Sequence, residues 1–210
     1  ALEQQDFCRR LWRREPGLWS EDESERRKIA NALGWLHAPQ KVEKTAGDLL
    51  LFRREVKDAG FKYVVHMGMG GSSLAPMVFQ RTFGPGDDGL PLQVLDSTDP
   101  GAVAAVAENG ALENTLFIAA SKSGTTTEAI DFMEYFYAEV QKAKGAGAGE
   151  NFVAITDPGT PLVAVARQHG FRRLFVNYAD VGGRYSALTL FGMVPAALLG
   201  LDIEMLLARG

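Results

Sequence analysis

Hydroxyl side chains gather in one short stretch of the sequence, residues 121–127, which read Ser-Lys-Ser-Gly-Thr-Thr-Thr. The preceding residues, 116–120, form an apolar run typical of a buried strand, and from Glu128 apolar residues recur at helical spacing. The stretch is therefore predicted to be a tight turn between a strand and a helix N-terminus. Hydroxyls, backbone N–H groups and the positive end of a helix dipole together suit a phosphate group.

The hydroxyl residues that we expect to bind this phosphate are Ser121, Ser123, Thr125 and Thr126. The alternative is a helix start whose hydroxyls only cap the helix itself. One cap needs one hydroxyl and the turn contains five, which favours the anion site. Lys122 is expected to point to water and is given no catalytic role.

A second turn, residues 68–73, reads Gly-Met-Gly-Gly-Ser-Ser and follows the predicted strand 63–67. Successive glycines allow a ligand to approach the backbone closely. A dinucleotide fingerprint would have a third glycine where Ser73 stands, and the phosphate-loop fingerprint of nucleotide triphosphatases is absent. We therefore expect neither a nicotinamide cofactor nor a nucleoside triphosphate.

A third motif, residues 182–186, reads Gly-Gly-Arg-Tyr-Ser and follows the last predicted strand. The guanidinium of Arg184 can bind a phosphate or stabilise negative charge that develops on oxygen. The alternative is a structural arginine that binds backbone carbonyls. His66 lies inside a strand and is interpreted as a packed core residue. No His, Cys or Asp cluster has metal-ligand spacing, so no metal and no other cofactor is expected.

These motifs need a scaffold in which strands alternate with helices. Apolar runs predict strands at 63–67, 92–95, 116–120, 152–155 and 174–176. The alternation indicates an α/β, three-layer αβα fold with a five-stranded, parallel, doubly wound sheet of order 2-1-3-4-5. Strands 1 and 3 are neighbours in that order, so the turns that follow them are expected to meet at one crevice.

Residues 1–60 show no convincing strand and are predicted to be an N-terminal helical segment, followed by one domain over 61–210. Within the segment, helices are predicted over 2–14, over 20–37 with Ser20 as the N-cap, and over 39–59. Residues 145–149 are predicted to be a flexible surface loop.

Composition excludes several classes of protein. The net charge of −4 provides no basic field to attract nucleic acid. Cys8 is the single cysteine, which excludes an internal disulfide and fits the reducing cytoplasm. No apolar run approaches the ~18 residues of a membrane helix, so no membrane partner is expected. The chain begins at Ala1 and stops just after a helix-like stretch, and we expect it to be a piece of a longer protein.

Together, the three motifs resemble the glucose-6-phosphate isomerase family, specifically its N-terminal sugar isomerase (SIS) domain. The turns at 68–73 and 121–128 identify a SIS domain, and the motif at 181–186 is a signature of the isomerases. Residues 18–20, Leu-Trp-Ser, and 33–36, Leu-Gly-Trp-Leu, look like the isomerase part of bacterial transaldolase/glucose-6-phosphate isomerase fusions.

The resemblance implies that the phosphate of a sugar phosphate lies on Ser121, Ser123 and Thr126, with Gly71 and Ser72 closing over the substrate. It also implies that Arg184 stabilises the enediolate formed during proton transfer between C1 and C2.

Three positions depart from the family pattern. Ala129 stands where the family has another threonine of the phosphate site, and Leu190 and Phe191 are bulkier than the usual family residues.

In the family, the proton-shuttling Glu and the associated Lys and His lie in a second SIS domain, and this chain has no matching residues. We therefore expect the phosphate-binding half of an enzyme of glycolysis and gluconeogenesis that interconverts glucose 6-phosphate and fructose 6-phosphate. This half is expected to bind without turnover, to require the second SIS domain of the same protein, and to form a homodimer.

The apolar run 188–201 is expected to face the second domain in part. Two alternatives stay open, namely a SIS-domain sensor of sugar phosphates and another phosphosugar isomerase.

Overall fold

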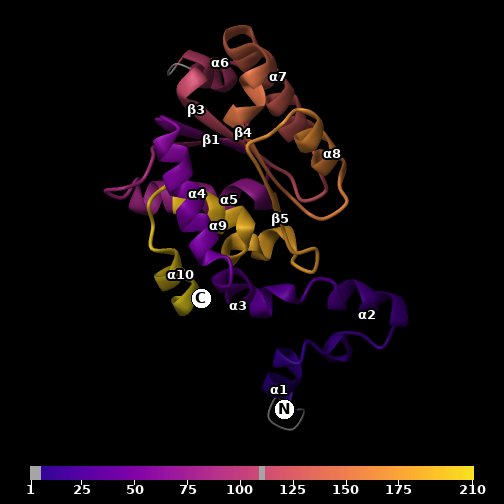
Figure 1. The fold of residues 1–210 in the computed structure, drawn as a ribbon. Coiled ribbons are helices and arrows are strands. Elements are labelled where there is room, and N and C mark those ends of the chain that lie inside the picture. Colours follow the sequence, from indigo (N-terminus) through magenta and orange to yellow (C-terminus); the bar gives the residue numbers. More distant parts are fainter. Residues whose placement is uncertain (1–5, 109–111) are drawn as a thin grey trace.

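The computed structural model describes residues 6–108 and 112–210. A five-stranded sheet lies at its centre (Figure 1), with the order β2-β1-β3-β4-β5. Every neighbouring pair is parallel, which confirms the predicted fold class and strand order. The strands are β1 (Tyr63–Gly68), β2 (Leu92–Leu95), β3 (Thr115–Ala120), β4 (Phe152–Thr156) and β5 (Arg173–Val176).

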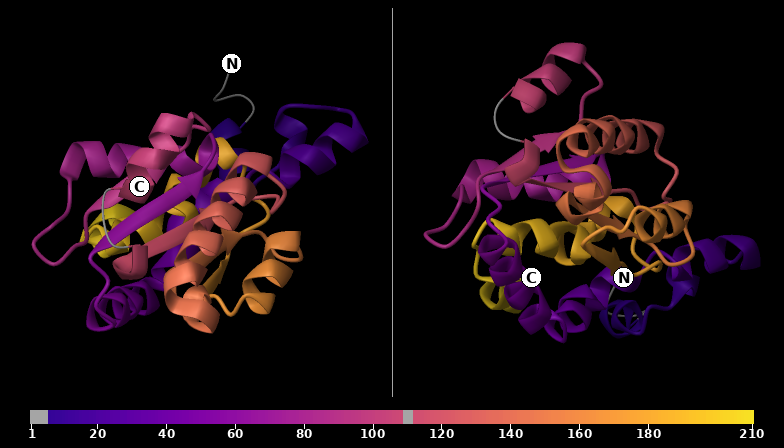
Figure 2. Two further views of the ribbon diagram at one scale, coloured as in Figure 1. Left: turned by 90° about the horizontal axis from the view of Figure 1, so that it is seen from above. Right: turned by 45° about the horizontal axis from the view of Figure 1, so that its top comes forward.

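Helices cover both faces of the sheet and complete the three layers (Figure 2). Neighbouring strand residues point to opposite faces, so Val64 packs in one apolar cluster and Val65 in the other. One face is covered by α4 (Ala46–Asp58), α5 (Gly71–Phe83), α9 (Leu190–Leu198) and α10 (Ile203–Arg209). The other is covered by α6 (Pro100–Glu108), α7 (Thr127–Lys144) and α8 (Pro161–Gln168).

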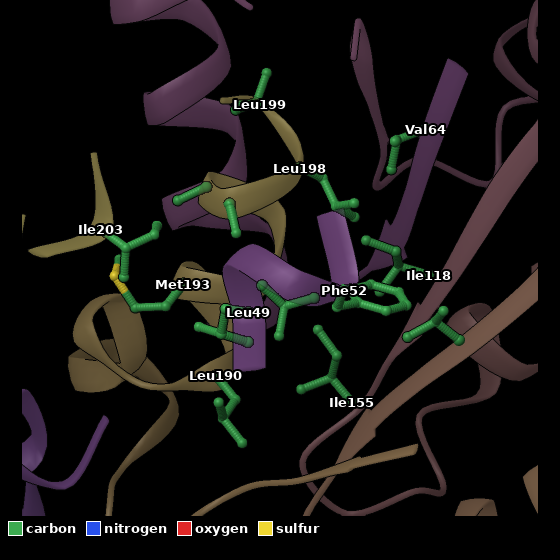
Figure 3. Packing of buried hydrophobic residues seen from close by; sticks show 14 of the residues in the cluster. Leu49, Phe52, Val64, Ile118, Ile155, Leu190, Met193, Leu198, Leu199 and Ile203 are labelled. Carbon is green, nitrogen blue, oxygen red and sulfur yellow. The ribbon is translucent and has the colours of Figure 1, made fainter. Parts of the chain in front are cut away.

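Helix α9 is buried along its whole length. Figure 3 shows Met193 and Leu198 of this helix among side chains from α4 and the sheet. The expectation that the run 188–201 faces a second domain is therefore wrong for α9, because the sheet and helices of this chain already cover it. The bulky side chains of Leu190 and Phe191 belong to the same core, where they are 6% and 2% exposed.

The N-terminal segment is helical as predicted, but its helices are shorter. It contains α1 (Phe7–Trp12), α2 (Glu23–Ala30) and α3 (Ala38–Glu43), with 3₁₀ helices at Pro16–Leu18 and Gly34–His37. Residues 2–5 of the first predicted helix lie outside the described residues. In Figure 1, α1 and α2 project from the layered body on the side opposite α6 and α7.

The boundaries of the second and third predicted helices are wrong. The N-cap of α2 is Asp22, whose carboxylate accepts the N–H of Glu25 at 2.9 Å, and Ser20 instead accepts the N–H of Asp22 at 3.1 Å. Helix α2 ends at Ala30 because the chain then turns to form an isolated antiparallel bridge between Leu33 and Val181. The third predicted helix is divided into α3 and α4.

The predicted flexible loop at 145–149 is a 3₁₀ helix, Gly145–Asn151, with a buried end. A Cβ atom at Gly149 would lie 2.0 Å from the carbonyl oxygen of His169, so glycine here allows two backbones to touch. The amide group of Asn151 donates to the carbonyls of Leu112, Glu113 and Thr115. Ala148 and Gly149 therefore serve close packing, while residues 145–147 are exposed at the surface as predicted. Across the described ranges, no helix has the length and apolar character required to cross a membrane.

Candidate functional site

A cleft of about 710 Å³ opens at the carboxyl edge of the sheet. Parallel strands end at the same edge, and the segments that follow four of them meet there. Gly68 at the end of β1 pairs with Ala120 at the end of β3, so their two turns begin side by side. The lining residues are Asn31, Ala32, Met69, Gly71, Ser72, Lys122, Ser123, Thr126, Asp157, Pro158, Thr160, Ala179, Val181, Gly182 and Gly183.

The hydroxyl turn after β3 is held by its own hydrogen bonds. Ser121 is 1% exposed, and its hydroxyl lies 2.9 Å from that of Thr126. The hydroxyl of Ser123 accepts the backbone N–H of Thr125 at 3.2 Å and its hydroxyl at 2.9 Å. Thr126 is the N-cap of α7, yet its side chain makes no capping hydrogen bond to the helix. The hydroxyls thus order the turn, and the alternative in which they only cap α7 does not describe this site.

Glycine is required at position 124 for two reasons. Its φ of +66° lies in the left-handed region, which side chains with a Cβ rarely adopt. A Cβ atom there would also lie 2.7 Å from the Cβ of Thr160, the N-cap of α8. The hydroxyl turn therefore packs directly on the segment that follows β4.

Lys122 does not point to water, so that prediction is wrong. Its amino group donates to the carboxylate of Asp157 and, at 3.1 Å, to the carbonyl of Ala179. Asp157 is buried directly after β4, and it also accepts a hydrogen bond from the amide of Asn177 at 3.4 Å. Lys122 thus joins the segments after β3, β4 and β5, and its charge is paired.

The glycine turn at residues 68–73 is joined to the motif that carries Arg184. A Cβ atom at Gly71 would lie 2.4 Å from the carbonyl oxygen of Gly183, so the two backbones are in contact. The buried hydroxyl of Ser186 donates to the carbonyls of Gly183 at 2.7 Å and Gly71 at 3.1 Å. Gly71 and Ser72 line the cleft, and the strand order places β1 and β4 on the two sides of β3.

His66 is fully buried beneath this turn, which confirms its interpretation as a core residue. Burial lowers the pKa of its imidazole to about 4, so the ring is neutral near pH 7. Its Nε2 lies 2.7 Å from the carbonyl oxygen of Ser72, and a neutral ring with the proton on Nε2 donates to that oxygen. Within the described part of the chain, its Nδ1 has no hydrogen-bond partner.

Arg184 is exposed and lies outside the main cleft. It lines a neighbouring cavity of about 220 Å³, and Gly71 and Gly183 border both spaces. Its guanidinium makes no hydrogen bond or ion pair with the residues that the structure describes. The alternative in which Arg184 binds backbone carbonyls is therefore not observed.

The structure brings Gly71, Ser72, Ser123 and Thr126 together in the cleft. Three other predicted site residues are not among its lining residues. Ser121 is buried and bonded to Thr126, and Thr125 is exposed and bonded to Ser123. Arg184 lies beyond the contact between Gly71 and Gly183.

Sequence reasoning missed several lining residues. Asp157 and Thr160 follow β4, and the rule that strand ends share an edge extends to them. Asn31 and Ala32 had no such signal, because their local pattern resembles an ordinary helix end. Among the described residues, no cluster of three or more His, Cys, Asp or Glu side chains could hold a metal ion.

The sequence of this chain is similar to those of known isomerases. A family model described as phosphoglucose isomerase matches residues 55–210. A glucose-6-phosphate isomerase from Thermosynechococcus vestitus is 39% identical over 149 residues, which cover 70% of this chain and 28% of that protein. One from Carboxydothermus hydrogenoformans is 32% identical over 192 residues, which cover 87% of this chain and 41% of that protein.

Two solved structures are similar to this chain in fold. A hypothetical protein from Thermus thermophilus matches 98% of this chain with a TM-score of 0.81 and 27% identity, and the match covers 47% of that chain. A glucose-6-phosphate isomerase from Chlamydia trachomatis matches 94% of this chain with a TM-score of 0.68 and 26% identity, over 35% of its own length. The chain thus spans less than half the length of each of these four relatives.

Proposed function

This chain belongs to the phosphoglucose isomerase family, and from that premise we propose that it is the half of a glucose-6-phosphate isomerase that binds the phosphate of the substrate. The observation that carries the proposal is the cleft that is lined both by Ser123 and Thr126 and by Gly71 and Ser72 of the turn at residues 68–73. In the whole protein, the reaction is the interconversion of glucose 6-phosphate and fructose 6-phosphate.

Two helix N-termini support binding of a phosphate in this cleft. Helix α5 begins at Gly71 and α7 at Thr127, and neither helix has a side-chain cap. In α5 the N–H groups of Ser72 and Ser73 already donate to the carbonyls of Met69 and Gly70, so α5 contributes mainly through its dipole. The first N–H groups of a helix and its dipole attract an anion. Because Asp157 neutralises Lys122, the attraction comes from these helix ends and the hydroxyls, and not from a lysine charge. Ser121 contributes by fixing the hydroxyl of Thr126.

Arg184 is proposed to act on the sugar and not on the phosphate. Its guanidinium is unpaired among the described residues and lies beyond the Gly71–Gly183 contact that forms one wall of the cleft. A positive group there stabilises negative charge on sugar oxygens as the enediolate forms.

The base for proton transfer is proposed to come from outside this chain. Transfer between C1 and C2 requires a base within hydrogen-bond reach of the carbon-bound proton. Asp157 is the one carboxylate among the described residues that line the cleft, and Lys122 holds it. We therefore infer that the chain binds sugar phosphates without isomerising them.

A second SIS domain of the same protein, within a homodimer, is the proposed source of the base. Apolar side chains on α5 support docking of such a domain beside Arg184. Leu74 and Val78 line the same cavity as Arg184, and they are 53% and 56% exposed.

Isothermal titration calorimetry tests the proposal. We expect 6-phosphogluconate to release or absorb heat on binding, while glucose, which lacks the phosphate, gives no signal. A coupled isomerase assay on the same sample should detect no turnover. If no phosphosugar binds, the hydroxyl turn is only structural and the proposal is wrong. Turnover by the isolated chain would contradict the proposal that the base lies elsewhere.

A further inference from the structure

The N-terminal segment contacts the site through Asp180, in the loop after β5. The Asp180 carboxylate lies 2.8 Å from Nη2 of Arg14, and its two oxygens lie 3.0 and 2.9 Å from Nζ of Lys41. Residues 1–54, which include both cations, precede the region that the family model matches. These ion pairs therefore connect the N-terminal segment, which precedes the family-model match, to the wall of the cleft.

Backbone contacts reinforce this connection. The N–H of Gly34 donates to the carbonyl of Asp180 at 2.7 Å, and Leu33 forms a bridge with Val181. A Cβ atom at Gly34 would lie 2.3 Å from Cγ of Asp180, so only glycine allows this approach. These contacts fix one arrangement of the N-terminal segment relative to the loop that contains Asp180.

The loop that contains Asp180 continues directly to residues of the site. Val181, Gly182 and Gly183 line the cleft, and Tyr185, next to Arg184, stacks on Trp35 with ring centroids 5.5 Å apart. The N-terminal segment also lines the cleft itself, with Asn31 and Ala32. One wall of the cleft is therefore built from both segments and depends on the contact between them.

We propose that the N-terminal segment is part of the sugar-phosphate site, with Asp180 as the positioning residue that holds the wall facing the sugar. This inference rests on the proposed function, because it takes the hydroxyl turn as the phosphate site. The hydroxyl turn keeps its own hydrogen bonds and its Lys122–Asp157 pair, and none of these involves the side chain of Asp180. Its link to the loop after β5 is the hydrogen bond from Lys122 to the backbone carbonyl of Ala179, which the substitution of the Asp180 side chain does not remove. Asp180 consequently affects recognition of the sugar more than recognition of the phosphate.

The substitution Asp180→Asn tests whether Asp180 affects recognition of the sugar more than recognition of the phosphate. It keeps the shape of the side chain, removes the negative charge, and leaves Arg14 and Lys41 facing a neutral amide. We expect the affinity for 6-phosphogluconate to fall about fivefold to tenfold, as for the loss of two part-buried ion pairs that order a binding wall. The affinity for inorganic phosphate should change by less than about twofold, because the hydroxyl turn is intact.

A matched control is Glu55→Gln. Glu55 pairs with Arg173 at 2.8 Å, and the two side chains are 41% and 39% exposed. Arg173 begins β5, at the edge of the sheet opposite the cleft. Loss of this pair should leave both affinities unchanged.

Gly34→Ala provides a second, independent variant, since its methyl group must displace Asp180. It should reproduce the selective loss of 6-phosphogluconate affinity, and thermal melting confirms that each variant is folded. Unchanged affinity for 6-phosphogluconate in both folded variants, or an equal loss for inorganic phosphate, would overturn the role of Asp180. If the unaltered chain binds neither ligand, the proposed function itself fails.

Discussion

At the scale of single residues, two hydroxyls of the same turn have different surroundings. Ser121 is buried and bonded to Thr126, while Thr126 lines the cleft. The inner hydroxyl therefore orients the outer one, and the outer one is the group that we propose binds a phosphate oxygen. Substitutions at the two positions should have different effects on binding and on folding.

Thr126→Ala should weaken binding of 6-phosphogluconate by about 1.5–3 kcal/mol, because it removes one hydrogen bond to a charged acceptor. Calorimetric titration measures the loss. Thr127→Ala is the matched control, since Thr127 is the next residue, is exposed and is not among the lining residues of the cleft. Equal affinity in the unaltered chain and the Thr126 variant would contradict the phosphate assignment.

Lys122→Met should destabilise the fold by about 1–3 kcal/mol, because Asp157 is buried and loses the cation that it binds. Urea unfolding followed by tryptophan fluorescence measures the free energy of unfolding. The double variant Lys122→Met with Asp157→Asn should recover part of the loss, since the unpaired charge is then gone. No recovery would indicate that the two side chains are not energetically coupled.

His66 should make stability depend on pH. Burial lowers its pKa to about 4, whereas the unfolded side chain titrates near 6.5, so the unfolded chain binds more protons between these values. The contribution of neutral His66 is complete above pH 6.5 and falls as the pH drops, by up to about 3 kcal/mol at pH 4. Urea unfolding at pH 7 and pH 5 should show a smaller difference for His66→Gln than for the unaltered chain, and equal differences would refute this assignment.

At the scale of elements, α9 illustrates how one helix supports the site. It is buried between the sheet and α4, and it begins immediately after the segment that carries Arg184 and Ser186. Its N-cap, Thr189, accepts the N–H of Phe191 at 3.3 Å and donates to the carbonyl of Ser186 at 2.7 Å. Packing of α9 therefore fixes the end of the third motif.

Phe191→Ala should lower the free energy of unfolding by about 3–5 kcal/mol, because a ring that is 2% exposed leaves a cavity. The control Phe83→Ala, at a position that is 56% exposed, should change it by less than about 0.5 kcal/mol. Thermal or urea unfolding distinguishes the two. Similar losses would mean that Phe191 contributes less to the core than its burial indicates.

The sheet and its crevice could be predicted from the sequence because their signals are local. Apolar runs mark the strands, and the shared edge of parallel strands places the turns at 68–73 and 121–127 together. The N-terminal helices could not be predicted as well, since contacts distant in sequence, such as Gly34 with Asp180, end them. For the same reason, the pairing of Lys122 with Asp157 and the place of Asn31 in the cleft had no local signal.

At the scale of the whole molecule, the described part of the cleft offers groups for a phosphate but no unpaired carboxylate. The cleft contains groups that suit a phosphate, while its one carboxylate among the described lining residues is already paired. The matched relatives are more than twice as long as the region they share with this chain. A base and a further wall from a second domain are consistent with that difference in length. The resemblance to the transaldolase fusions stays a prediction.

The most direct test of the central claim is a residue-by-residue map of where a sugar phosphate binds. Titration of ¹⁵N-labelled chain with 6-phosphogluconate should shift the backbone amide signals of residues 70–72 and 122–127 in the NMR spectrum, at the N-termini of α5 and α7. Inorganic phosphate should shift the same signals, and glucose should shift none. Shifts confined to other parts of the chain, or no shifts at millimolar ligand, would contradict the assignment of the hydroxyl turn as the phosphate site.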